Sequence, residues 1–213
     1  DAGAFTIDAA TGAVAVTTPL DHETKDMYGL SVEATDGVAG SPADIATVTI
    51  TVTDVNEAPV IAAQEFTVAE NAAVGTGIGT VLASDIDAGQ ALTFAITAGN
   101  EEGLYALSPE GVLTVGGALD HETEPGHELT IRVTDDADPG ALSSAATVTV
   151  TVTDVDEPPV ITSTAPTTAT EDAVYSYQVT AADPEDGDLT FSLSDAPEVM
   201  TISETGLVAW TPG

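Results

Sequence analysis

The sequence predicts an all-β protein built as a rod of tandem Greek-key antiparallel β-sandwiches, each of about 100 residues. Three observations support this fold class. Motifs recur along the chain at roughly one domain length, Thr alternates with Val or Ile in several segments, and turn-forming residues separate those segments. We find no window with the period of an amphipathic helix.

The clearest strand signals are ATVTITVTD at 46–54 and ATVTVTVTD at 146–154. Alternation with a period of two predicts that each strand has one buried face and one face in solvent. The segments ELTIRVTD at 128–135 and ALTFAIT at 91–97 alternate in the same way. The turn-forming segments are AATG at 9–12, SPEG at 108–111 and DADPG at 136–140. Short strands with frequent turns are typical of a β-sandwich.

The chain repeats itself. LDHET at 20–24 returns at 119–123, and TDVNEAPVI at 53–61 is answered by TDVDEPPVI at 153–161. Both offsets are about 100 residues, which is the size of one small domain. We therefore interpret the chain as a piece of a longer array. The predicted parts are the C-terminal part of one domain at 1–57, a complete domain at 58–157 and the N-terminal part of another at 158–213.

The net charge of the chain excludes some classes of binding partner and favours others. The chain has 36 acidic residues against two Lys and Arg residues, and a formal net charge of −34. Such a charge repels phosphates, which argues against nucleic acid and anionic lipid, and it favours cations. There is no cysteine, so disulfides and cysteine zinc sites are excluded. No segment approaches the roughly 20 apolar residues that span a bilayer.

The acidic motif lies at the predicted domain boundaries. Both Thr/Val-rich strands run into it, and a proline follows. Asp54, Asn56 and Glu57 stand close together just before Pro59. Neighbouring carboxylates repel unless a cation neutralises them, and calcium takes six to eight oxygen ligands from Asp, Glu, Asn and backbone carbonyls. The linkers therefore predict calcium sites between consecutive domains.

Together these motifs resemble the cadherin repeat, over residues 1 to about 157. That family ends each domain with Asp-x-Asn-Asp-Asn-x-Pro, and it carries Leu-Asp-Arg-Glu, an N-terminal Glu and Asp-x-Asp. The similar segments here are DVNEAP at 54–59, LDHE at 20–23 and 119–122, AEN at 69–71 and DID at 85–87. The last part, with DPEDGDLTF at 183–191 and TGLVAWTPG at 205–213, is more similar to the bacterial dystroglycan-type cadherin-like variant.

The resemblance implies two clusters of calcium ligands. At the first boundary they are Asp21, Glu23, Asp54, Asn56, Glu57, Asp85, Asp87 and Asp135. At the second they are Glu70, Asp120, Glu122, Asp154, Asp156, Glu157, Asp183 and Asp186. Calcium would neutralise these groups and lock neighbouring domains into a stiff rod. We expect His22 and His121 to be exposed and not to bind a transition metal, and Trp210 to lie in the sandwich core.

The family resemblance implies a calcium-rigidified segment of a large extracellular bacterial surface protein that mediates or supports calcium-dependent cell adhesion. Its partners would be calcium ions, other surface proteins, copies of itself, or glycans. Two alternatives stay open: a subunit of an extracellular filament, and a polysaccharide-binding module of a secreted protein, which would need an exposed aromatic strip. We do not expect an enzyme, because no Gly-x-Ser-x-Gly motif occurs and paired glycosidase carboxylates would not explain acids that recur at linkers.

Overall fold

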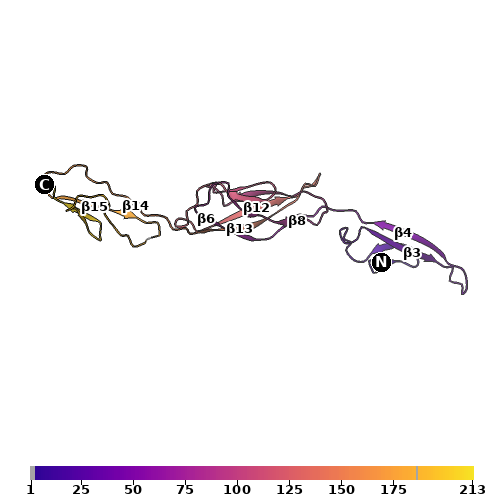
Figure 1. The fold of residues 1–213 in the computed structure, drawn as a ribbon. Coiled ribbons are helices and arrows are strands. Elements are labelled where there is room, and N and C mark those ends of the chain that lie inside the picture. The colour runs from indigo at the N-terminus through magenta and orange to yellow at the C-terminus, as the bar shows by residue number, and fades with distance from the viewer. Residues whose placement is uncertain (1–2, 186) are drawn as a thin grey trace.

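The computed structural model describes residues 3–185 and 187–213. Its strands form three units that follow one another along a rod (Figure 1). The N-terminal unit holds β1–β4, the central unit β5–β13 and the C-terminal unit β14–β18. No sheet in these ranges combines strands of two units, and no helix occurs in them. The predicted all-β fold class is confirmed.

The central unit is a complete sandwich. One sheet has the strand order β6-β13-β12-β9, and the other has the order β10-β11-β7. β12 pairs antiparallel with β13 and β9, whereas β6 pairs parallel with β13. A small β5–β8 pair lies toward the N-terminal unit. The strands are β5 (Val60–Ile61), β6 (Gln64–Ala69), β7 (Gly77–Thr80), β8 (Ala83–Ser84), β9 (Thr93–Ala98), β10 (Tyr105–Leu107), β11 (Val112–Val115), β12 (Gly126–Thr134) and β13 (Ser143–Thr153).

Alternating residues of β12 and β13 fill the space between these two sheets. Leu129 and Ile131 in β12, and Val148 and Val150 in β13, have no exposed surface. Leu113 of the opposite sheet is equally buried and belongs to the same cluster. The residues between these positions on β12 are exposed or half-buried. The predicted alternation of buried and solvent-facing residues is therefore confirmed in this unit.

The turn in SPEG requires its glycine. Gly111 has a φ of +88°, a left-handed conformation that L side chains rarely adopt. A Cβ at this position would lie 2.7 Å from the carbonyl oxygen of Val81, which is buried in the core. Glycine thus allows the tight connection from β10 to β11.

The N-terminal unit consists of two separate antiparallel pairs, β1–β2 and β3–β4. The strands are β1 (Phe5–Ile7), β2 (Val14–Val16), β3 (Met27–Ala34) and β4 (Asp44–Thr51). We expected β4 to bury one face, but only Ile50 is half-buried and the rest of the strand is exposed. The reason is that the described part of this unit holds no counterpart of β6, β7 or β9 to pack against that face.

The C-terminal unit has a three-stranded sheet in the order β15-β18-β17 and a small β14–β16 pair. The strands are β14 (Val160–Ile161), β15 (Tyr175–Gln178), β16 (Ala181–Ala182), β17 (Thr201–Ile202) and β18 (Leu207–Trp210). Trp210 is half-buried and pairs with Tyr175 across the sheet. Both side chains line an apolar cavity of this unit.

Candidate metal centres between the units

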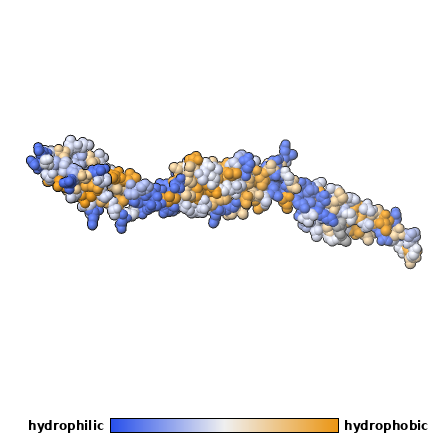
Figure 2. Space-filling view, viewed as in Figure 1, coloured by the Kyte–Doolittle hydropathy of each residue, from blue (hydrophilic) through white to orange (hydrophobic). Residues whose placement is uncertain are grey.

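Two short linkers without strands join the units. The first runs between β4 and β5 and contains residues 54–58, and the second runs between β13 and β14 and contains residues 154–158. We call their surroundings the first and the second junction. Figure 2 shows hydrophilic residues gathered where the units meet, with more hydrophobic surface along the central unit. The acidic residues singled out in the sequence therefore concentrate at the narrow points of the rod.

At the first junction, four carboxylates converge. One oxygen atom from each of Glu23, Asp54, Glu57 and Asp87 lies within 4.8 Å of the others. Glu23 belongs to the N-terminal unit, Asp54 and Glu57 belong to the linker, and Asp87 follows β8 in the central unit. The group therefore draws on both units and on the linker between them.

Asp87 anchors this group, since its side chain is only 6% exposed. Its Oδ2 accepts a hydrogen bond from the backbone N–H of Glu57 at 2.9 Å. Asp85 supports it by accepting a hydrogen bond from the backbone N–H of Asp87 at 3.1 Å. Buried oxygens of both residues, Asp87 Oδ1 and Asp85 Oδ2, have no hydrogen-bond partner. Unpaired buried carboxylate oxygens are unfavourable, and they are the ligand atoms that calcium prefers.

Asn56 ties the linker to the central unit. Its amide donates to Asp135 Oδ2 at 3.1 Å and to the Gly140 carbonyl at 3.3 Å, and its oxygen accepts from Gln90 at 2.6 Å. Burial alone would raise the pKa of Asp135, but hydrogen bonds from Asn56 and from the backbone of Leu142 and Ala137 lower it below its usual value. Asn56 and Asp135 are therefore in contact with each other, although neither joins the four-carboxylate group.

Asp21 lies outside that group as well. Its carboxylate accepts hydrogen bonds of 2.9 Å from both the backbone N–H and the hydroxyl of Thr24. The backbone bond first, and then the hydroxyl bond, lower the pKa of Asp21. Asp21 therefore stabilises the turn that contains Glu23.

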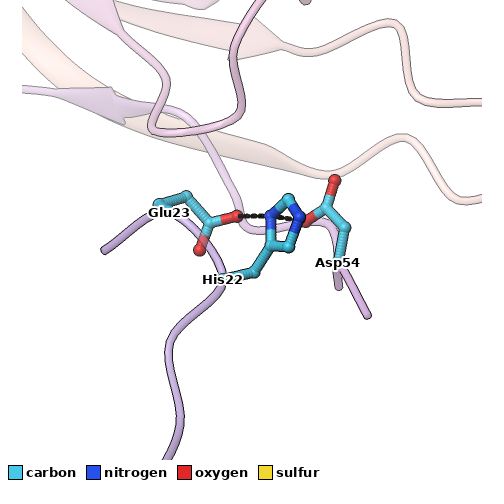
Figure 3. A group of neighbouring side chains, drawn as sticks. All are labelled: His22, Glu23 and Asp54. Atoms are coloured by element: carbon cyan, nitrogen blue, oxygen red, sulfur yellow. Dashed lines mark hydrogen bonds and ion pairs between the residues drawn. The ribbon is translucent and has the colours of Figure 1, made fainter. Parts of the chain in front are cut away.

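His22 lies between two acids of the first junction (Figure 3). Its Nδ1 is 3.0 Å from Glu23 Oε1 and 3.7 Å from Asp54 Oδ1. The hydrogen bond to Glu23 raises the pKa of His22. His121 contacts Glu122 at 3.2 Å in the same way. Both histidine side chains are about one third exposed, at 35% and 32%, so the expectation that they are exposed is corrected to half-burial beside the acids.

The second junction gathers carboxylates around Glu122. One group joins Glu122 with Glu70 and Asp120, and another joins it with Glu157 and Glu185. A third group contains His121, Glu122 and Asp154, and within each group the ligand atoms lie within 4.8 Å of one another. Asp120 therefore belongs to a carboxylate cluster, because Glu70 lies beside it, whereas its counterpart Asp21 at the first junction belongs to none. The described N-terminal unit has no residue at the position of Glu70.

Glu70 holds the second linker in place. It is 6% exposed, and its carboxylate accepts from the backbone N–H of His121 at 2.8 Å and of Val155 at 2.6 Å. The bond from His121 is the main cause of a lowered pKa for Glu70, although partial burial opposes it. Glu70 therefore connects the turn at Asp120 with the linker even without a cation.

Glu185 is a site residue that our sequence analysis missed. Its Oε1 accepts from the backbone N–H of Glu157 at 3.0 Å, as Asp87 accepts from Glu57. Asp183 accepts from the backbone N–H of Glu185 at 3.2 Å, as Asp85 does from Asp87. Aligning DPE at 183–185 with DID at 85–87 without a gap would have found it.

Two residues that we assigned to the second junction remain outside its clusters. Asp156 is exposed and belongs to none of the groups found among the described residues. Asp186 lies outside the described residues.

The crowding of acids changes their protonation. Desolvation, followed by the hydrogen bond to Glu185 and the charges around it, raises the pKa of Glu157 to about 7. Desolvation and the charges of Glu23 and Asp87 also raise the pKa of Glu57. Glu185 shifts the other way, because the backbone N–H of Glu157 lowers its pKa. Both junctions therefore hold more negative charge than their surroundings stabilise, which is the condition that a bound cation would relieve.

Comparison with known families agrees with this geometry. The family model described as "Cadherin domain" matches residues 1–53 and 64–153, and the one described as "Putative Ig domain" matches residues 158–213. The last part thus matches an immunoglobulin-type model, not a cadherin model as the first two parts do.

Similar proteins are large animal protocadherins. Protocadherin Fat 2 of Rattus norvegicus is 41% identical over 143 residues, which cover 64% of this chain and 3% of that protein. Protocadherin Fat 4 of Mus musculus is 33% identical over 213 residues, which cover 96% of this chain and 4% of that protein. The chain thus spans only a few per cent of the length of these relatives. Because they are animal proteins, they give no support to a bacterial source.

Solved structures show the same fold. Repeats EC22-24 of mouse cadherin-23 superpose with a TM-score of 0.72 at 24% identity, covering 99% of this chain and 72% of that one. Repeats EC3-6 of protocadherin gammaB7 superpose with a TM-score of 0.66 at 26% identity, covering 98% of this chain and 56% of that one.

Within the described ranges, no helix has the length and apolar character needed to cross a membrane.

Proposed function

Because the chain belongs to the cadherin family, we propose that it is a calcium-rigidified segment of a large extracellular protein that supports calcium-dependent cell adhesion. Cadherin repeats are extracellular and have no enzymatic activity, and this segment shares both properties. The observation that carries the proposal is the convergence of Glu23, Asp54, Glu57 and Asp87 from two units and their linker. The domain boundaries at 57/58 and 157/158 are part of the same proposal.

The donor sets fit calcium. At the first junction, Glu23, Asp54, Glu57 and Asp87 would hold the ion, with Asp85 beside them. At the second, the ligands would be Glu70, Asp120, Glu122, Asp154, Glu157, Asp183 and Glu185. Oxygen-only donors with unpaired buried atoms suit calcium, whereas zinc prefers nitrogen and sulfur. Bound calcium supplies positive charge that the acids share.

The chain's own residues explain why such charge would stiffen the rod. In each junction the acids repel one another, and that repulsion favours conformations in which the units separate or swing. Neutralising the acids removes this repulsion, and ligands from both units then restrict the linker. Asp87 and Glu185 already accept the backbone N–H of Glu57 and Glu157, so the linker is positioned before any ion binds.

The dystroglycan-type assignment of the last part stays a proposal within this account, as do surface proteins and copies of the chain as adhesive partners. The polysaccharide-binding alternative finds no support in the surface. All nine aromatic side chains are buried or half-buried, so the described residues present no exposed aromatic strip.

Calcium titration followed by small-angle X-ray scattering tests the proposal. We expect the scattering of the wild-type chain to change from a flexible to a stiff rod as calcium rises. Asp87→Asn should weaken the calcium dependence, because it removes a buried ligand charge at the first junction. Glu128→Gln is the matched control, since it removes one exposed acid on β12 away from both linkers. Scattering that is identical in calcium and in chelator would refute the proposed function.

A further inference from the structure

The second junction contains a histidine among its acids. One ring nitrogen of His121 and one carboxylate oxygen each of Glu122 and Asp154 all lie within 4.8 Å of one another. His121 and Glu122 belong to the turn before β12, and Asp154 directly follows β13. The complete central unit and the start of the linker that leaves it therefore supply the whole group.

The first junction repeats this group with His22, Glu23 and Asp54 (Figure 3). These are the residues that the LDHET and TDV repeats align with the group at the second junction. The third histidine of the chain, His127, belongs to no such group among the described residues. Its side chain is 7% exposed and its ring packs edge-on against Tyr105. A ring nitrogen beside two carboxylates is therefore a feature of one position in the repeat.

The spacing of the ligand atoms suits a small transition-metal ion. Zinc binds nitrogen and oxygen at about 2.0–2.2 Å in tetrahedral geometry, which places neighbouring ligand atoms about 3.4 Å apart. His121 Nδ1 lies 3.2 Å from Glu122 Oε1. At the first junction, His22 Nδ1 lies 3.0 Å from Glu23 Oε1 and 3.7 Å from Asp54 Oδ1. An ion can therefore replace the contact between ring and carboxylate with only small movements of the side chains.

The nitrogen donor distinguishes the His121 group from the other clusters of the second junction. The clusters that contain Glu70 or Glu185 offer carboxylate oxygens only. Calcium takes oxygen ligands, whereas imidazole suits zinc, copper and nickel. Three protein ligands also leave a fourth tetrahedral position for water. The donor set of one nitrogen and two oxygens therefore favours zinc at this point of the junction.

Glu70 holds together the two segments that carry these ligands. Its carboxylate is 6% exposed and accepts from the backbone N–H of His121 at 2.8 Å. It also accepts from the backbone N–H of Val155, the residue after Asp154, at 2.6 Å. An ion therefore has to order side chains but not the backbone, and positioning ligands in advance lowers the entropic cost of binding.

We propose that His121, Glu122 and Asp154 form a zinc site, and that the equivalent group of the first junction forms a weaker one. We expected no transition metal at His121 because we expected an exposed ring, and its half-burial beside two acids changes that interpretation. Glu122 and Asp154 are also among the proposed calcium ligands, so zinc would displace calcium from part of the second junction. That competition rests on the proposed function, whereas the zinc site rests on the geometry of the three side chains.

The difference in affinity follows from the residue three positions after each histidine. Lys25 holds this position at the first junction and Glu124 holds it at the second. Lys25 lines an open cavity together with His22, Glu23 and Asp54, where its positive charge opposes a further cation. The negative charge of Glu124 favours one. The second junction should therefore bind zinc first.

Nitrogen-15 NMR of the histidine rings tests the site on the wild-type chain, because three rings can be followed separately. In calcium-free buffer, zinc should shift Nδ1 of His121 first and Nδ1 of His22 second, and it should leave His127 unchanged. Magnesium should not reproduce these shifts, since it prefers oxygen ligands. A shift confined to His127, or no shift of any ring at millimolar zinc, would overturn the inference.

Calorimetry of two variants assigns the tighter site. His121→Gln should weaken the first zinc-binding step by roughly tenfold or more, since loss even of a group that supports a ligand costs about 10–100-fold. The backbone N–H that Glu70 accepts is kept in this variant, so the turn should be kept as well. His127→Gln is the matched control and should bind zinc as the wild type does. Equal zinc affinity of the two variants would show that His121 is not a ligand.

Calcium added to the zinc-loaded chain separates this inference from the proposed function. If Glu122 and Asp154 are shared, calcium should reverse the zinc-induced shift of His121. Zinc binding that calcium leaves unchanged would overturn the competition and count against these two residues as calcium ligands, while the zinc site would stand. Stiffening by calcium in a chain whose rings never respond to zinc would refute the zinc site and leave the proposed function intact.

Discussion

The two junctions share a linker sequence but are held by different groups in the absence of a metal. At the first, the neutral amide of Asn56 donates to Asp135 and to a backbone carbonyl of the central unit. At the second, Asp156 replaces that amide and has no hydrogen bond among the described residues. The linker is held there by the carboxylates of Glu70 and Glu185. Both linkers are also held by a carboxylate of the following unit, Asp87 or Glu185, so the amide of Asn56 is an additional neutral donor that the second junction lacks.

This difference has a consequence for the calcium dependence of each junction. At the first linker, the bond from the Asn56 amide to the Gly140 carbonyl does not depend on the charge of the acids. The second linker depends on acids that also repel one another, and the raised pKa of Glu157 reflects that repulsion and its desolvation. We therefore expect the second junction to lose more order than the first when calcium is removed.

Removal of calcium should have the largest effect. A ligand at about one hundred times its Kd stabilises the folded state by about 2.7 kcal/mol. Chelation should therefore lower the melting temperature, and it should speed amide hydrogen exchange more in linker 154–158 than in linker 54–58. Calorimetry and exchange measured by mass spectrometry, with and without chelator, check this. Equal acceleration of exchange in both linkers would remove the proposed difference.

Glu70→Ala should have the next largest effect. It leaves the backbone N–H groups of His121 and Val155 without their acceptor. Loss of such bonds should lower the melting temperature of the central unit by on the order of 5 °C, even in chelator. Glu65→Ala, at an exposed position of β6, the strand that ends just before Glu70, is the control and should change it little. A Glu70 variant that melts like the control would show that these bonds do not hold the linker.

The pH dependence of folding stability should distinguish the second junction from the first. The folded state raises the pKa of Glu157 from 4.5 to about 7. The folded chain then binds more protons than the unfolded chain between these values, so stability in chelator should fall as pH rises through this window. Carboxyl carbon-13 NMR should show Glu157 titrating near neutrality, with Glu57 shifted in the same direction. Glu157→Gln should remove this pH dependence of stability. A titration midpoint for Glu157 near 4.5 would show that desolvation and the neighbouring acids do not raise its pKa.

The smallest effect should come from exchanging the amide and the acid. Asn56→Asp should remove the bonds to Asp135 and Gly140 and raise hydrogen exchange of the first linker in chelator toward that of the second. Asp156→Asn should change little, because Asp156 is exposed and makes no hydrogen bond among the described residues. Exchange rates that respond equally to both substitutions would show that Asn56 has no special role.

The strands, the repeat and the convergence of acids at the linkers could all be predicted from the amino-acid sequence. Alternation of Thr with Val and Ile is a local signal, and the backbone follows it in β4 as it does in β13. The recurring order of LDHE, the linker acids and DID indicated which residues would meet, and Glu23, Asp54, Glu57 and Asp87 do meet. These features follow from local spacing and repetition.

Tertiary packing determines which of those residues share a centre and which strands are buried. Asp120 joins a cluster and Asp21 does not, because the carboxylate of Glu70, which follows β6, lies beside the turn at Asp120. Glu185 faces the linker because the chain turns after β16, a position that composition did not indicate. Val48 and Val148 have nearly identical neighbours in sequence but very different exposure. Burial depends on what packs against a strand, and that partner comes from a distant part of the chain.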